Sequence, residues 1–187
     1  MKNLLIVLVF MGMVSCDNSL TEKEKQEYTN KGNEISQATF KALSEKLTEQ
    51  MKLGGPSLAI PFCNIEAMPL TRELSEQYDV TIKRTSDKLR NQENKPTTRE
   101  LEIINIYHKL ISEERELTPI VEVDNNNKKH YYAPILLKTN CLTCHGNVPE
   151  FVSVKTDSII KSLYPRDMAI GYKDGDLRGI WSIEFEK

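Results

Sequence analysis

Apolar residues recur at helical spacing in two long segments of the chain. The first runs over residues 34–52 and predicts a long N-terminal helix that packs one apolar stripe into the core. The stripe consists of Phe40, Leu43, Leu47 and Met51. The segment Gly54-Gly55-Pro56 predicts the end of this helix, because glycine adopts the left-handed cap and proline cannot continue a helix. A homodimer interface along the same stripe is the alternative to core packing.

The second helical segment, residues 97–116, begins with Thr97 and Glu100 at the spacing of a capping box. Its apolar face is expected to contain Leu101, Ile104, His108 and Ile111. We therefore expect His108 to point towards an apolar surface, where a histidine is more often a hydrogen-bonded core residue than a ligand. A shorter helical stretch is predicted within residues 151–163.

Shorter segments alternate between apolar and polar residues and predict β-strands. They cover residues 78–84, 119–123, 131–137, 168–172 and 177–185. The second and third strands flank a turn and predict a hairpin, beside which His130 is expected to be exposed. The last two strands predict another hairpin, whose final strand places Trp181, Ile183 and Phe185 on one face. This order of helices and strands predicts an α+β fold with one face of an antiparallel sheet against the helices.

The N-terminus has the pattern of a lipoprotein export signal. Lys2 precedes an apolar run over residues 4–14, which is too short for a good membrane-spanning helix, and Ser15-Cys16 places a small residue before an acylatable cysteine. We expect residues 1–15 to be a cleaved signal peptide, Cys16 to be acylated, residues 16–33 to form a tether and residues 34–187 to form one domain. An ordinary cleaved signal is the alternative. Either signal directs the protein to the periplasm or cell envelope, where the lipid would anchor it.

Charge excludes one class of partner. The formal net charge is −2, with 25 basic and 27 acidic residues, so the sequence has no basic excess that would attract nucleic acid.

The most specific chemical signal is the segment Cys141-Leu142-Thr143-Cys144-His145-Gly146, which has the C-x-x-C-H pattern of c-type haem attachment. The two thiols would form thioethers with the vinyl groups of one haem, and His145 would be the proximal iron ligand. Gly146 is expected to let the backbone pass close to the porphyrin. A disulfide, a redox-active pair and half a zinc site are the alternatives. A zinc site needs two more ligands at short spacing and a redox pair needs a βαβ context, and the sequence has neither.

Cys63 is the cysteine that remains once lipid and haem have taken the other three. It lies in the apolar segment of residues 57–67, so it is either a buried, inert thiol or a distal iron ligand opposite His145. Met68 and Met168 are rival soft ligands, and His108 is a further candidate. Arg84, Lys88 and Arg90 follow a predicted strand.

Arginine suits carboxylates, so Arg84 and Arg90 are candidates for contacts with the haem propionates. A solvated basic loop is the alternative.

These segments together resemble a small c-type-haem domain with a PAS-like fold, known as a domain of unknown function, that occurs alone or as the sensory part of bacterial signalling proteins. The matching pieces include Ala59-Ile60 with Cys63 and Ala67, Arg84 with Lys88-Leu89-Arg90-Asn91, the haem motif, residues 164–172, and Leu177-Arg178-Gly179. The resemblance implies a PAS-like antiparallel sheet with flanking helices. It also implies that Cys63 is the distal axial ligand, giving His/Cys ligation.

Two functions fit these expectations closely. One is a redox or diatomic-gas sensor, whose output another protein would read because no kinase, cyclase or methyl-accepting region follows residue 187. The other is an electron-transfer cytochrome. The expected partner is accordingly a signalling protein or a redox protein. We do not expect an enzyme, since a peroxidase needs a distal acid/base residue and only His108 is available for that role.

Overall fold

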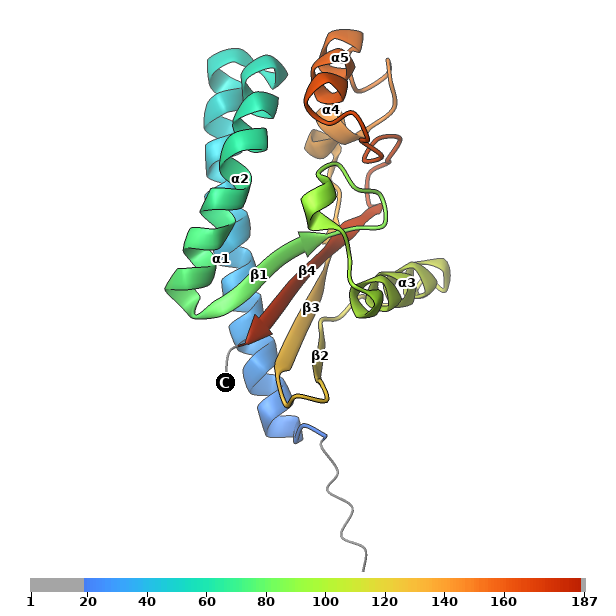
Figure 1. Ribbon diagram of the computed structural model, residues 1–187. Coiled ribbons are helices and arrows are strands. Elements are labelled where there is room, and N and C mark those ends of the chain that lie inside the picture. The colour runs from blue at the N-terminus through green and yellow to red at the C-terminus, as the bar shows by residue number, and fades with distance from the viewer. Residues whose placement is uncertain (1–18, 186–187) are drawn as a thin grey trace, which may run out of the picture.

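Residues 19–185 are described by the computed structural model, so the predicted signal peptide and Cys16 lie outside the described residues. A four-stranded antiparallel sheet forms the centre of the fold, with strand order β1-β4-β3-β2 (Figure 1). The strands are β1 (Val80–Thr85), β2 (Ile120–Val123), β3 (Lys129–Leu136) and β4 (Leu177–Phe185). The α+β class is confirmed, but helices cover both faces of the sheet, so the prediction that one face packs against the helices was wrong.

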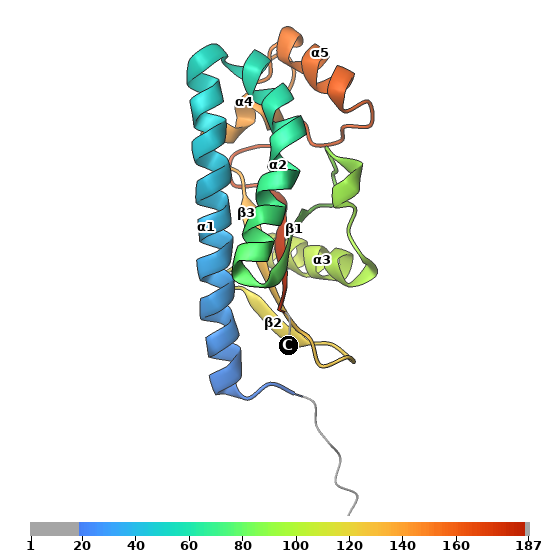
Figure 2. The same ribbon diagram turned by 60° about the vertical axis from the view of Figure 1, so that its left-hand side comes forward.

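Two long helices cover one face of the sheet, as Figure 2 shows: α1 (Glu22–Gly54) and α2 (Pro56–Tyr78). Ile35 of α1 packs in one cluster with the inner face of all four strands, including Trp181, Ile183 and Phe185 of β4 as predicted. The chain turns between the helices at Gly55, whose φ of 62° is left-handed, and Pro56 then starts α2.

The segment predicted as a tether is helical from Glu22 onwards. Thr21 and Glu24 form the capping box that starts α1, a signal at the same spacing as the one recognised at Thr97. The first turns of α1 also pack against the sheet, since the Tyr28 and Phe185 rings meet edge to face with centroids 4.9 Å apart.

The predicted apolar stripe of α1 is wrong at two positions. Phe40 is 58% exposed and Leu47 is also exposed, whereas the buried positions are Gly32, Ile35, Ser36 and Thr39. The upper half of α1 extends beyond the sheet and runs beside α2 (Figures 1 and 2), so its apolar residues are not all buried. At Gly32 an added Cβ would lie 2.2 Å from the Tyr131 ring, so only glycine allows this close approach to the sheet.

The other face of the sheet packs against α3 (Thr98–Ser112), which begins at the predicted Thr97 capping box. Its buried residues are Glu100, Ile103, Ile104 and Tyr107. The predicted face was therefore wrong for Leu101, His108 and Ile111, which are exposed. Tyr107 occupies the core position instead, because its hydroxyl donates to carbonyl oxygens of Thr118 and Tyr132 at 3.0 and 3.1 Å.

Three further predictions need correction. Residues 56–78 form α2 although Pro61 and Pro69 lie inside it, and no helix was predicted there. Residues 168–172 form no strand; β4 instead pairs with β1 and β3, which are distant in sequence. The side chain of His130 is only 14% exposed and lies 3.4 Å from Asp124, so the predicted exposure was wrong. The β2–β3 hairpin is confirmed.

The remaining helices lie towards the upper end of the sheet in Figure 1, and two of them contain the Cys141–His145 segment. They are the 3-10 helices η1 (Gln92–Asn94) and η2 (Thr139–Cys141), and the α-helices α4 (Leu142–His145) and α5 (Val154–Leu163). Within residues 19–185, no helix is long and apolar enough to cross a membrane.

Candidate haem-attachment site

The C-x-x-C-H motif forms one tight helical unit. Cys141 ends η2 and the next four residues form α4, which is anchored where Leu142 packs with Leu137, Ala169 and Tyr172. Gly146 ends α4 by donating its N–H to the carbonyl of Leu142 at 2.8 Å. A Cβ at Gly146 would lie 2.7 Å from Cβ of Phe151 and 2.8 Å from the Leu142 carbonyl oxygen. Packing within the protein therefore already favours glycine at this position, and the approach to a porphyrin stays a prediction.

His145 has a fixed tautomer. Its Nδ1 lies 2.8 Å from the carbonyl oxygen of Ala169, and because a carbonyl can only accept, Nδ1 must carry the proton. Nε2 is therefore the nitrogen with a free lone pair, as an iron-binding histidine requires. Burial lowers the pKa of His145 well below its ordinary value, and the charges of Arg90 and Arg178 act in the same direction, so the ring is held neutral.

The three described cysteines are free thiols and all are half-buried. Cys144 packs at the edge of the cluster formed by Ile60 of α2 with Val152 and Ile160. Cys63 lies one turn further along α2, and its charge is close enough to raise the pKa of Cys144. The helix that the sequence analysis missed thus brings Cys63 to the motif.

Burial is the main effect on the Cys63 thiol. It raises the pKa of Cys63, while the charges of Arg84 and Arg90 act in the opposite direction and favour the thiolate. The pKa of Cys144 is also raised by burial, and Arg90 opposes this shift too. Both thiols are therefore protonated and inert in ordinary conditions unless another group stabilises their anionic form.

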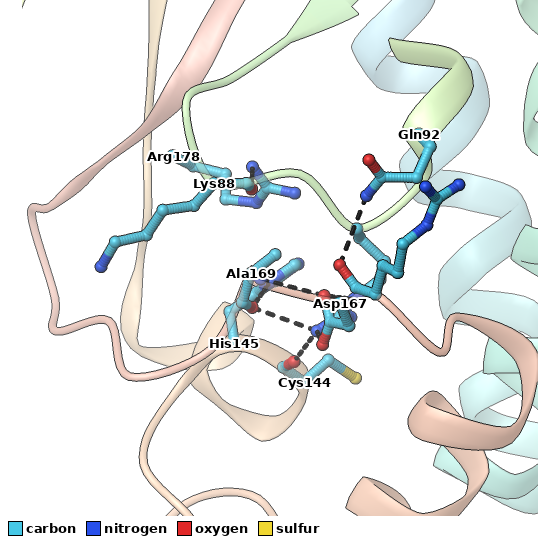
Figure 3. Close-up of polar contacts among 9 residues, drawn as sticks. Lys88, Gln92, Cys144, His145, Asp167, Ala169 and Arg178 are labelled. Atoms are coloured by element: carbon cyan, nitrogen blue, oxygen red, sulfur yellow. Dashed lines mark hydrogen bonds and ion pairs between the residues drawn. The ribbon is translucent and has the colours of Figure 1, made fainter. Parts of the chain in front are cut away.

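Figure 3 shows Cys144, His145, Asp167 and Ala169 close together at the motif. Arg90 ties the motif to the loop that holds His145. Its Nη2 donates to the Cys144 carbonyl at 2.7 Å and to the Ala169 carbonyl at 3.1 Å. Its Nε donates to Asp167 Oδ1 at 3.1 Å, and the same oxygen accepts the N–H of Ala169 at 2.9 Å. The side chains of Arg90 and Asp167 are 14% and 4% exposed, so this ion pair is buried. Arg90 thus holds the backbone carbonyl that also fixes the ring of His145.

Arg84 and Arg178 lie near the same site, but neither forms an ion pair with a described carboxylate as Arg90 does. Arg84 of β1 lies over the Trp181 ring, 5.8 Å from its centroid, and forms no hydrogen bond or ion pair with the described residues. Arg178 of β4 lies 5.8 Å from the centroid of Tyr172 and donates to the Lys88 carbonyl at 3.2 Å. The sequence analysis did not select Arg178 as a site residue; its only signal was its place among the segments of the resemblance.

The rival ligands are two methionines and one histidine at other positions of the fold. Met168 is 58% exposed on the loop before Ala169, and Met68 is half-buried on α2 one turn beyond Cys63. His108 is exposed on α3, where its Nε2 lies 3.1 Å from Asp87. Within residues 19–185, no three His, Cys, Asp or Glu side chains are grouped to hold a metal ion.

A cavity of about 330 Å³ lies away from the motif, on the α3 side of the sheet. Its charged lining residues are paired, most closely Lys83 with Glu100 at 2.7 Å and Arg99 with Glu122 at 2.6 Å. None of the predicted site residues lines it.

Comparisons with known proteins agree with this architecture. The chain superimposes on the crystal structure of the cyanobacterial heme-protein Tll0287 with a TM-score of 0.61 and 17% identity, over 90% of this chain and 98% of that chain. No curated protein matches the chain. The Tll0287-like family matches over residues 19–185, which spans the whole described structure and confirms the resemblance found in the motifs. The chain belongs to the Tll0287-like family.

Proposed function

We propose that the chain is a c-type haem protein in which Cys141 and Cys144 bind one haem and His145 is an axial ligand. The observation that carries this proposal is the hydrogen bond from His145 Nδ1 to Ala169, which leaves Nε2 free beside two half-buried thiols. The printed name of the similar cyanobacterial structure, a heme-protein, supports the same cofactor. When bound, the haem supplies an iron that exchanges one electron or binds a diatomic gas.

We assign the second axial position to Cys63. Its place on α2 near Cys144, and the two arginine charges that favour its thiolate, support this ligand over the rival methionines. Arg84 fits a propionate contact because its donors are unused. Arg90 has Nε and Nη2 engaged by the protein, which supports a positioning role for it and leaves Nη1 for any propionate contact.

The function we propose is that of a redox or diatomic-gas sensor component, with electron transfer as the alternative. A thiolate opposite an imidazole favours ferric iron, and its release on reduction would open a site for a gas. An electron carrier instead keeps both ligands. We propose no enzymatic activity, because His108 is exposed beside Asp87 and no other described histidine is free for acid/base work at the site.

The setting follows from the N-terminal signal. We propose export to the periplasm or cell envelope with a lipid anchor at Cys16. The partner is then a signalling protein or redox protein of that compartment, with a homodimer as a further option and no nucleic acid. Mass spectrometry of the membrane fraction tests this location: an acylated Cys16 is expected, and an unmodified chain starting after another residue would contradict the anchor.

Absorption spectra of protein co-produced with c-haem maturation factors test the ligands. We expect covalently bound haem, a low-spin ferric spectrum of the thiolate type, and CO binding after reduction with dithionite. Cys63→Ala should change the ferric spectrum and raise the reduction potential, while Met68→Leu on the same helix should change neither. A spectrum that is typical of methionine ligation and does not change when CO is added would favour electron transfer. It would also show that Cys63 is a buried, inert thiol.

A further inference from the structure

Three arginines surround the motif, and together they have one ion-pair partner. Within the described part of the chain, Asp167 is the only carboxylate that forms an ion pair with any of them, and its partner is Arg90. Arg84 and Arg178 therefore contribute two positive charges that no carboxylate of residues 19–185 neutralises by direct contact. A half-buried charge without a counterion destabilises the fold unless a ligand provides one.

Arg84 shows the imbalance most clearly. Its guanidinium lies over the Trp181 ring on the sheet face covered by α1 and α2, with five N–H donors and no acceptor among the described residues. Burial lowers the pKa of Arg84, and the charge of Arg178 lowers it further, so the two cations repel each other. A cation–π contact stabilises such a group only modestly and does not replace a counterion.

Arg178 sits in a second group of unsatisfied donors. Its guanidinium and the Lys88 ammonium both lie over the Tyr172 ring, 5.8 and 4.9 Å from the centroid. Figure 3 shows Arg178 and Lys88 beside the loop that carries Ala169. The hydroxyl of Tyr172 is buried and has no hydrogen-bond partner of good geometry, although Ser86 and Arg178 lie near enough to affect its pKa. Tyr172 also meets His145 edge to face, so these donors border the proposed haem.

We infer that Arg84 and Arg178 form a binding site for two carboxylate groups, with the Tyr172 hydroxyl as a further donor. Two surplus guanidinium charges match two carboxylates, and the planar fork of arginine binds carboxylate oxygens in pairs. The inference rests on the proposed function in one respect, because the two propionates of a haem held at Cys141 and Cys144 are the nearest source of such groups. A small free dicarboxylate has the same chemistry and is the other source.

Arg99 provides the matched control. It is an arginine of helix α3, and it donates to Glu122 and Glu102 at 2.6 Å each. Because two carboxylates already neutralise the charge of Arg99, we expect it not to bind an added carboxylate. Arg99→Gln therefore removes the same group as Arg84→Gln and Arg178→Gln without touching the proposed site.

The first test uses the haem-loaded full chain. Resonance Raman bands of the propionate bending modes respond to hydrogen bonding at the carboxylates, and we expect them to shift in Arg84→Gln and Arg178→Gln. Both should also move the reduction potential to more negative values, while Arg178→Lys restores the potential in part and Arg99→Gln changes neither signal. Unchanged propionate bands in both site variants would exclude the propionates as ligands.

The second test separates the two sources and does not depend on haem. Full-length protein produced without maturation factors is titrated with succinate while its melting temperature is followed, with chloride at equal ionic strength as the reference. Succinate should raise the melting temperature of the wild-type chain and of Arg99→Gln, but not of Arg84→Gln with Arg178→Gln. If succinate also stabilises the haem-loaded protein and the propionate bands do not respond, the ligand is a free dicarboxylate. No stabilisation and no band shift would overturn the inference, whereas a wild-type chain that fails to attach haem overturns only the proposed function.

Discussion

The α3 side of the sheet and the surroundings of the C-x-x-C-H motif differ in how their charged side chains are paired. On the α3 side, Lys83 pairs with Glu100 at 2.7 Å and Arg99 pairs with Glu122 at 2.6 Å, so each cation meets a carboxylate beside a cavity. Beside the C-x-x-C-H motif, three arginines share one carboxylate. The difference separates ion pairs within the protein from the charges for which we propose a ligand. A cavity alone is therefore a weaker guide to function here than unpaired charge next to a reactive motif.

The largest expected effect is the loss of covalent haem when both attachment cysteines are replaced. In the double variant Cys141→Ser with Cys144→Ser, no thioether can form, so covalent haem should be lost completely. A haem stain of denatured protein on a gel measures this, and Cys63→Ser should keep full staining because it leaves both attachment thiols. Staining of the double variant would show that these cysteines do not attach haem.

The next largest effect is a loss of stability when either of two buried ion pairs, Arg90–Asp167 or Lys83–Glu100, loses its cation. Arg90→Met leaves Asp167 charged in a site that is 4% exposed, and the free energy of unfolding should fall by about 3 kcal/mol. Lys83→Met should cost about 2 kcal/mol, because Lys83 is 25% exposed and solvent screens the pair. Urea unfolding of both variants measures these changes.

Only the Arg90 variant should alter the haem. Arg90 and His145 donate to the same carbonyl, Ala169, so loss of Arg90 strengthens the bond from His145 and removes a nearby positive charge. Both changes favour ferric iron, and the reduction potential should become more negative. Asp167→Asn should move it in the opposite direction, and Lys83→Met should leave it unchanged. Equal potentials in the three variants would reduce Arg90 to a purely structural role.

A smaller effect concerns pH on the α3 side. Burial raises the pKa of Glu100, but the bonds from Lys83, the Thr97 backbone and Ser182 outweigh it, so its folded pKa lies below 4.5. A depressed carboxyl pKa stabilises the fold above the unfolded pKa, and this contribution is lost as the pH falls through the folded pKa. The wild-type chain should thus lose stability below about pH 4.5 more steeply than Glu100→Gln, as measured by urea unfolding at several pH values. Parallel curves would contradict this assignment.

The sequence predicted the parts of the fold that local signals determine. The capping box at Thr97 and the glycine-proline break after α1 both lie where expected, because each depends on a few neighbouring residues. The helix α2 was missed because Pro61 and Pro69 normally interrupt helices, and its packing against α1 and α5 overrides that preference. The pairing of β4 with β1 likewise depends on long-range contacts that no local pattern contains.

In the candidate site, too, some residues are predicted by local sequence and others are recognised only from the folded structure. The C-x-x-C-H spacing predicts that the two thiols and His145 bind haem, because attachment chemistry requires that order. Arg84 and Arg178 are recognised only after folding, since what distinguishes them is the absence of a carboxylate partner in the described chain. Arg90 was predicted as a propionate contact, and its hydrogen bonds to the backbone of the motif became visible only in three dimensions.

The smallest expected effect concerns His108, the rival ligand that the apolar spacing of α3 suggested. Its side chain is 46% exposed and lies 3.1 Å from Asp87, and an exposed polar contact of this kind contributes less than about 1 kcal/mol. His108→Ala should therefore leave the ferric spectrum, CO binding and reduction potential unchanged and lower the free energy of unfolding only slightly. Helix α3 would have to rotate by roughly a quarter turn to bury His108. A spectral change in His108→Ala would therefore require a different packing of α3 on the sheet. Such a packing would remove the contrast between the α3 side and the motif, on which the site assignment rests.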